Sequence, residues 1–129
     1  MIGVARGVTV FAYADPCDMR KNFDTLSAIV TETLRRDVLT GDLYLFVSRN
    51  RKRAKVLYFD GTGMCLFSKR LEKGLFSAPW KRAKKSTIEM TLSELALFVE
   101  GSEVIGRRAL SPPLLTRVDL RSKFPEANP

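Results

Sequence analysis

The chain has 129 residues, 45% of them hydrophobic and 9% aromatic, and a formal net charge of +8, which suits one folded domain and argues against intrinsic disorder in its body. No stretch approaches the roughly 20 apolar residues of a membrane span, and no charged leader precedes a long apolar run, so we expect a cytoplasmic protein without a membrane partner. Histidine is absent and the two cysteines, Cys17 and Cys65, are isolated, which excludes the usual zinc sites and histidine-based catalysis, and we expect no metal and no cofactor.

The first expected elements are a short strand and a helix. Residues 8–13 are mostly β-branched or aromatic and predict a strand, which Pro16 ends because proline cannot continue a ladder. Asp18 is expected to cap a helix from about Met19 to Arg36. The apolar stripe of that helix follows helical spacing and consists of Phe23, Leu26, Val30 and Leu34.

Three strands are expected next, as a meander. Residues 43–47 are apolar on both faces and predict a central strand, and residues 54–60 and 64–70 predict two more. Between the last two lies Asp60-Gly61-Thr62-Gly63, a strong hairpin signal because glycine accepts positive φ. The charged loop at 48–53 joins the first two strands and is expected to project from the sheet.

The last third of the chain is less regular. Residues 71–85 predict an irregular basic arm anchored by Phe76 and Trp80, and residues 87–90 either add a short strand or lead into the last helix. Thr91 and Glu94 form a capping box for that helix, which Gly101 ends. We therefore expect one α+β domain over 1–106, an antiparallel β-meander covered by two helices in the order β-α-β-β-β-(β)-α, and a Pro-rich C-terminal tail over 107–129.

Positive charge is concentrated in the middle of the chain. Residues 49–85 contain twelve Lys or Arg residues against two carboxylates, Asp60 and Glu72. Such an imbalance creates a local field that attracts polyanions, whereas a face that serves only solubility usually mixes both signs of charge. The candidate nucleic-acid-binding residues are therefore Arg49, Arg51, Lys52, Arg53, Lys55, Lys69, Arg70, Lys73, Lys81, Arg82, Lys84 and Lys85.

Carboxylate chemistry on DNA ends is the competing interpretation. Asp42 and Asp60 adjoin turn glycines, and Glu72 lies beside Arg70 and Lys73. Local backbone bonds and an ion pair explain these positions better than metal-assisted phosphoryl transfer does. We therefore predict that the chain is not an enzyme.

Two smaller signals leave alternatives open. Arg20 and Lys21 fall in the first turn of the expected helix, where cations oppose the helix dipole. Either an anion bound at the exposed N–H groups or a pair between Arg20 and Asp24 would account for them. Tyr58 and Phe67 can stack on bases if they face outward, although core positions are commoner for aromatic residues.

Three motifs, taken together and in order, resemble a known family. They are Asp18-Met19-Arg20-Lys21, then Asp60-Gly61-Thr62-Gly63, then Lys69-Arg70-Leu71-Glu72. The chain resembles the TnpB-type, or Orf2-like, accessory proteins of the insertion-sequence family sixty-six, which bacterial transposons encode. The similarity covers about residues 8–101.

That resemblance implies a non-catalytic accessory role in DNA transposition, beside a separate transposase that supplies the catalytic acidic residues. The expected partners are DNA, bound through the loop at Arg49–Lys55 and the arm at Lys69–Lys85, and the transposase and other transposon-encoded proteins. The alternative is a protein-interaction module that docks on the transposase or a partner subunit without direct DNA contact. The oligomeric state and any recognised DNA sequence stay open.

Overall fold

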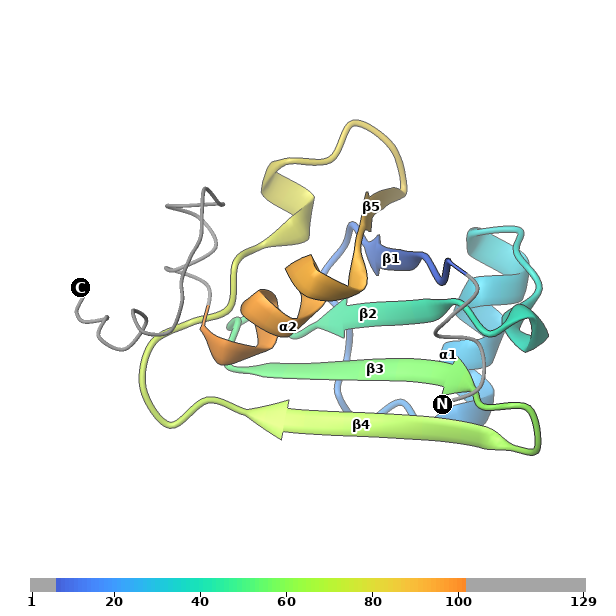
Figure 1. The fold of residues 1–129 in the computed structure, drawn as a ribbon. Helices are drawn as coiled ribbons and strands as arrows, with labels where there is room; N and C mark the ends of the chain where they lie inside the picture. Colours follow the sequence, from blue (N-terminus) through green and yellow to red (C-terminus); the bar gives the residue numbers. More distant parts are fainter. Residues whose placement is uncertain (1–6, 102–129) are drawn as a thin grey trace.

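A fully buried strand, β2 (Leu43–Val47), forms the centre of a five-stranded sheet in the computed structural model, which describes residues 7–101. On one side of β2 lie β3 (Arg53–Phe59) and then β4 (Met64–Arg70). On the other side lie β1 (Val10–Tyr13) and then β5 (Thr87–Met90), so that the order across the sheet is β4-β3-β2-β1-β5. The central position expected for residues 43–47 is confirmed, and residues 87–90 do form a strand (Figure 1).

The sheet is mixed. β1 pairs parallel with β2, with Phe11 opposite Tyr44, whereas β5 pairs antiparallel with β1. Only β2, β3 and β4 are consecutive antiparallel neighbours, so the expected antiparallel meander is not the whole sheet. Two adjacent parallel strands require a crossover, which the segment containing the first helix supplies. The α+β class is confirmed.

The first helix begins later than the sequence indicated. α1 spans Phe23–Ala28 and continues as a π-helical turn, η2 (Ile29–Thr33), where one α-helix from Met19 to Arg36 was expected. The backbone N–H of Asn22, at the start of α1, donates to Thr25 Oγ1 over 2.9 Å. The predicted helix is therefore correct in place and wrong in its limits and its uniformity.

Asp18 does not cap this helix, because its carboxylate binds Arg20, two residues further along the chain. Asp18 Oδ1 accepts from the backbone N–H of Arg20 over 2.9 Å, and Oδ2 lies 2.7 Å from the Arg20 guanidinium. These bonds hold the pKa of the Asp18 carboxyl well below its usual range. Arg20 and Lys21 precede the helix, so the expected conflict with its dipole does not arise, and Arg20 pairs with Asp18 in place of Asp24.

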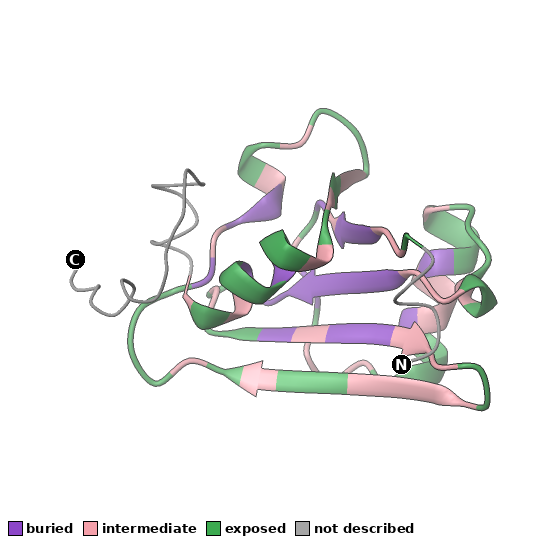
Figure 2. Cartoon of the chain, viewed as in Figure 1, coloured by how far each residue is buried: buried purple, intermediate pink, exposed green. Residues whose placement is uncertain are grey.

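Each face of the sheet carries its own apolar cluster, because alternate side chains of a strand point to opposite faces. On one face Leu26 of α1 and Val30 of η2 pack over β-strand residues that include Tyr44 and Phe46. On the other face α2 (Leu92–Glu100) supplies Leu95 and Phe98. Figures 1 and 2 show α2 in front of the sheet, α1 behind it, and β2 buried between them.

The expected apolar stripe of the first helix is only partly correct. Leu26 and Val30 are fully buried and Leu34 is half-buried, but Phe23 is 44% exposed. Phe23 is the first residue of α1, and this late start leaves it at the margin of the cluster.

Two local motifs form as the sequence indicated. Asp60 Oδ1 accepts from the backbone N–H groups of Thr62 and Gly63, each over 2.9 Å, and closes the β3–β4 turn. Thr91 and Glu94 make the reciprocal capping bonds at the start of α2, over 3.1 and 2.8 Å. Both motifs depend on neighbours in sequence, which is why they were readable without the fold.

The predicted boundary at residue 106 and the Pro-rich tail 107–129 lie outside the described residues. Within residues 7–101, no helix combines the length and apolar character needed to cross a membrane. Cys17 is buried and Cys65 is half-buried, and both are free thiols. Burial raises the pKa of the Cys17 thiol to about 11.

Candidate nucleic-acid interface

The strand directions bring three connecting segments to one end of the sheet. Because β1 and β2 run parallel and the other neighbours antiparallel, the carboxyl ends of β1, β2 and β4 lie beside the amino ends of β3 and β5. Residues 14–22, 48–53 and 70–86 therefore meet there, and we call this set the basic end. Backbone bonds join the segments, from Cys17 N–H to the Val47 carbonyl and from Ala14 N–H to the Ser86 carbonyl, each over 2.9 Å.

Exposed cations from all three segments gather at the basic end. They are Arg20, Arg49, Lys52, Arg53, Arg70, Lys73, Lys81, Arg82, Lys84 and Lys85. Within residues 7–101 the ion pairs are Arg20 with Asp18 and Arg70 with Glu72. The other cations of this set have no carboxylate within ion-pair distance in the described part of the chain.

Several carboxylates lie at the opposite end of the sheet. Asp42 precedes β2, Asp60 follows β3, and Glu94 lies just after β5, in the first turn of α2. The carboxylates of the basic end are Asp15, Asp18 and Glu72. In residues 7–101 no three potential metal ligands lie together. The basic end therefore carries many more cations than carboxylates.

The loop between β2 and β3 is shaped by its own polar side chains. Ser48, only 8% exposed, donates from Oγ to Asn50 Oδ1 over 2.8 Å and accepts from the backbone N–H of Arg53 over 3.1 Å. Asn50 Oδ1 also accepts from the backbone N–H of Lys52 over 3.0 Å. The loop thus carries its exposed cations on an ordered backbone. Sequence reasoning missed Ser48 and Asn50, although a Ser-x-Asn pair between two strands is a turn signal.

Arg51 bonds to the body of the protein, a contact that the sequence did not reveal. Its Nε donates to the Phe76 carbonyl over 2.8 Å, and the Phe76 N–H donates to the Arg51 carbonyl over 2.7 Å. Phe76 is fully buried and stacks on Phe98 with the ring centroids 5.4 Å apart. Arg51, which has a positive φ of 63°, therefore fastens the segment after β4 to the body. The expected anchoring role of Phe76 is confirmed, and Trp80 packs half-buried against the same cluster.

Lys55 and Lys69 are also held by the fold. Lys55 Nζ donates to the Lys21 carbonyl over 2.8 Å and to Asn22 Oδ1 over 3.2 Å. Lys69 Nζ donates to the Val99 carbonyl over 2.7 Å, in the last turn of α2, where a cation also favours the helix dipole. Both ammonium groups are therefore engaged with backbone carbonyls.

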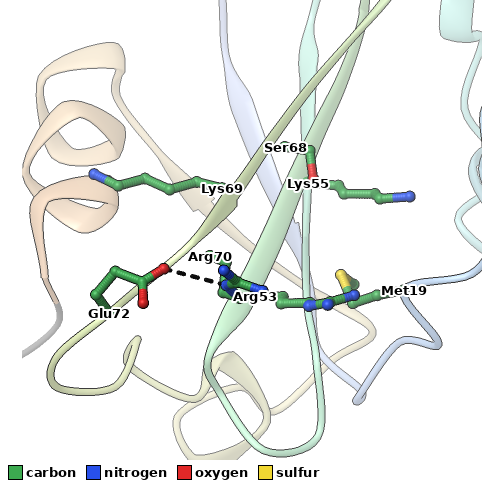
Figure 3. A pocket seen from close by; sticks show the side chains of 7 residues that line it. All are labelled: Met19, Arg53, Lys55, Ser68, Lys69, Arg70 and Glu72. Atoms are coloured by element: carbon green, nitrogen blue, oxygen red, sulfur yellow. Dashed lines mark hydrogen bonds and ion pairs between the residues drawn. The ribbon is translucent and has the colours of Figure 1, made fainter.

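Arg53 and Arg70 are directly opposite on β3 and β4. Glu72 Oε2 lies 3.2 Å from Arg70 Nε, and both of these side chains are largely exposed. Two like charges facing each other weaken strand pairing. The arginines open onto a shallow hollow of about 340 Å³, shown in Figure 3, whose lining residues are Met19, Arg53, Lys55, Ser68, Lys69, Arg70 and Glu72.

This hollow brings together two of the three sequence motifs. Met19 belongs to the first motif, and Lys69, Arg70 and Glu72 belong to the third. The second motif lies at the opposite end, where backbone N–H groups in the turn lower the pKa of Asp60 to about 2. Its role is therefore to shape the β3–β4 turn, as expected for Asp60.

The two aromatic residues considered for base stacking lie away from the basic end. Tyr58 is half-buried against the α2-side cluster. Phe67 is 45% exposed in the middle of the edge strand β4, across from Val56. Tyr58 serves the core, and neither ring joins the exposed cations.

Comparison with known proteins finds relatives over most of the chain. A family model described as IS66 Orf2 like protein matches residues 8–109. The chain is similar to two proteins of Sinorhizobium fredii (strain NBRC 101917 / NGR234), both of them called uncharacterized. It is 35% identical to protein y4jC over 101 residues, which cover 78% of this chain and 85% of the relative. It is 34% identical to protein y4hO over 101 residues, which cover 78% of this chain and 86% of that relative. No solved structure matches the chain.

Proposed function

This chain belongs to the IS66 Orf2-like protein family, whose members have an accessory role in DNA transposition, and we propose that it acts there by holding the phosphate backbone of DNA with its basic end. The observation that carries this proposal is the gathering of exposed cations at one end of the sheet, where those of residues 48–53 and 70–86 are mostly without an ion pair in the described part of the chain. A field of this kind speeds the encounter with a polyanion and is neutralised when phosphates bind.

The side chains suit two kinds of phosphate contact. Arg49, Arg53 and Arg70 offer planar groups of donors that bind phosphate oxygens in pairs, and the lysines of the arm offer mobile point charges. A phosphate between Arg53 and Arg70 would offset the repulsion of two arginines that face each other. Contacts of this type position DNA without reading its bases, so we expect binding that tolerates changes of sequence.

The proposed role is non-catalytic. Of the carboxylates at the basic end, Asp18 is paired with Arg20 and Glu72 with Arg70. Paired carboxylates of this kind support a structural role for both residues. In this proposal the transposase supplies the chemistry, and this protein supplies a surface for DNA.

The test compares two variants that lower the net charge equally. The first, R49Q/K52Q/R53Q, removes three exposed cations of the basic end and leaves Arg51 in place. The second, T31E/T33E/L39E, adds three acidic groups at exposed positions in η2 and in the 3₁₀ turn η3 (Val38–Thr40), toward the opposite end. Binding to a fluorescent DNA duplex is measured by anisotropy at about 50 and about 200 mM salt.

We expect the wild type to bind more weakly at the higher salt concentration, because bound cations release counterions from DNA. The slope of log affinity against log salt should fall by about 3 in R49Q/K52Q/R53Q. The control T31E/T33E/L39E should keep a slope close to that of the wild type. If both variants lost DNA affinity equally, the effect would be due to net charge and not to the basic end. If R49Q/K52Q/R53Q bound DNA as the wild type does, docking on the transposase without DNA contact would be favoured.

A further inference from the structure

At the end of the sheet opposite the basic end lies a buried hydroxyl without a well-formed hydrogen bond. Tyr44 is 1% exposed, and its phenol oxygen lies beside Arg36 and Thr40 but forms no hydrogen bond of good geometry among the described residues. A buried hydroxyl without a partner destabilises a protein, so such a group calls for an explanation. Tyr44 lines a second hollow of about 260 Å³, together with Arg35, Arg36, Asp37, Thr40 and Asp42.

The backbone beside this hollow is unusual. Arg35 has a φ of 57°, a left-handed conformation that side chains other than glycine adopt at a cost. It follows closely on the π-helical turn η2, a form that is rare in proteins and is frequent at functional sites. Both features place successive arginines, Arg35 and Arg36, at the rim of the same hollow.

The two arginines are free to receive an anion. The guanidinium carbon of Arg36 lies 3.8 Å from the centre of the Phe11 ring, a cation–π contact. The same guanidinium lies beside the Tyr44 hydroxyl. Within residues 7–101 neither Arg35 nor Arg36 forms an ion pair.

The carboxylates of the hollow are already engaged. Asp37 Oδ1 accepts from the backbone N–H of Leu39 over 3.0 Å. Asp42 Oδ1 accepts from the backbone N–H of Thr9 over 3.1 Å, and its Oδ2 accepts from Thr40 Oγ1 over 3.3 Å. The donors that remain without an acceptor carboxylate are the two guanidinium groups and the phenol hydroxyl of Tyr44.

We propose that this hollow is a carboxylate-binding site, which receives an Asp or Glu side chain of a partner protein. One carboxylate can accept paired bonds from a guanidinium and a further bond from the phenol hydroxyl. The nearby charges of Asp37 and Asp42 oppose any anion, but they disfavour a polyanion such as DNA more than a ligand with a single negative charge. The protein would then hold DNA at one end of its sheet and a protein partner at the other.

The experiment titrates the full-length, ¹⁵N-labelled protein with acetate, with inorganic phosphate and with an alanine-rich peptide that carries one central Glu. The resonances followed by NMR are the Arg36 Nε–H and the backbone amides of Leu39 and Thr40. The test variant is Tyr44→Phe, which deletes only the hydroxyl. The control is Tyr13→Phe, which deletes a half-buried hydroxyl next to the basic end.

We expect saturable shifts with acetate and tighter binding of the peptide. Tyr44→Phe should weaken both about tenfold, the loss expected when a hydrogen bond to a charged group disappears, while its melting temperature stays the same or rises. Tyr13→Phe should bind as the wild type does. The proposal is overturned if neither acetate nor the peptide gives a saturable shift, if phosphate binds more tightly than acetate, if the peptide binds no better than acetate, or if Tyr44→Phe binds normally or loses stability.

Discussion

Arg53 on β3 and Arg70 on β4 stand directly opposite each other in the sheet. Glu72 pairs with Arg70, and Arg53 has no ion pair among the described residues. Repulsion between like charges on facing strands lowers stability, so this arrangement is a cost to the free protein. It becomes favourable once an anion lies between the two guanidinium groups. Stability and DNA binding should therefore respond in opposite directions when one arginine is removed.

Arg53→Gln tests this relationship. The variant should be more stable than the wild type by about 0.2–1 kcal/mol, because one side of the repulsive pair is gone, and it should bind DNA more weakly. Urea denaturation measures the first effect and anisotropy the second. Arg49→Gln, in the turn before β3, should weaken DNA binding without a gain in stability. A loss of stability in Arg53→Gln would show that the pair is not repulsive.

Arg51→Ala should destabilise the fold, although Arg51 lies among the exposed cations in sequence. The change removes the bond from Nε to the carbonyl of Phe76, a fully buried residue. The expected loss is about 1–3 kcal/mol, the usual range for a charged donor removed from a partly buried acceptor. Arg49→Ala, at an exposed site, should change stability by less than about 0.5 kcal/mol. If Arg51→Ala and Arg49→Ala lowered the urea midpoint by equal, small amounts, the anchoring role of Arg51 would be contradicted.

Lys69→Met should destabilise the junction between β4 and α2. The ammonium group donates to the Val99 carbonyl, and this bond also places a positive charge at the carboxyl end of α2. The loss should be about 0.3–2 kcal/mol, and amides in the last turn of α2 should exchange faster with solvent. Lys73→Met, at an exposed position without such a bond, serves as the control. If the amides of α2 exchanged with solvent as slowly in Lys69→Met as in the wild type, this contact would be ruled out.

The Asp60 turn should make stability depend on acidity. Backbone N–H groups of Thr62 and Gly63 bind the charged carboxylate and lower its pKa from 3.8 to about 2 in the folded protein. A lowered pKa in the folded state means that the stabilisation is complete above pH 3.8 and is lost as the pH falls toward about 2. Asp60→Asn should lack this component of the pH dependence. An NMR titration of the Asp60 carboxyl checks it, and a midpoint near 3.8 would refute the prediction.

Local features of the fold were readable from the sequence because their causes lie within a few residues. The Asp60–Gly63 turn and the capping box at Thr91 and Glu94 each join neighbours in the chain. The central place of residues 43–47 followed from apolar side chains on both faces. The start of α1 was misjudged because Asp18 binds Arg20 in a turn of its own, and a carboxylate so engaged no longer caps a helix.

The sequence by itself determined that the protein is basic in its middle third, which residues carry that charge, and which local turns and caps form. The tertiary structure decided which cations are free. Arg51, Lys69 and Lys55 bind carbonyls 25, 30 and 34 residues away, contacts that no local pattern encodes. The parallel pairing of β1 with β2 likewise joins distant segments and brings residues 14–22 to the same end of the sheet as the basic segments 48–53 and 70–86. The physical reason is that packing and hydrogen bonding act between neighbours in space, which only the folded chain defines.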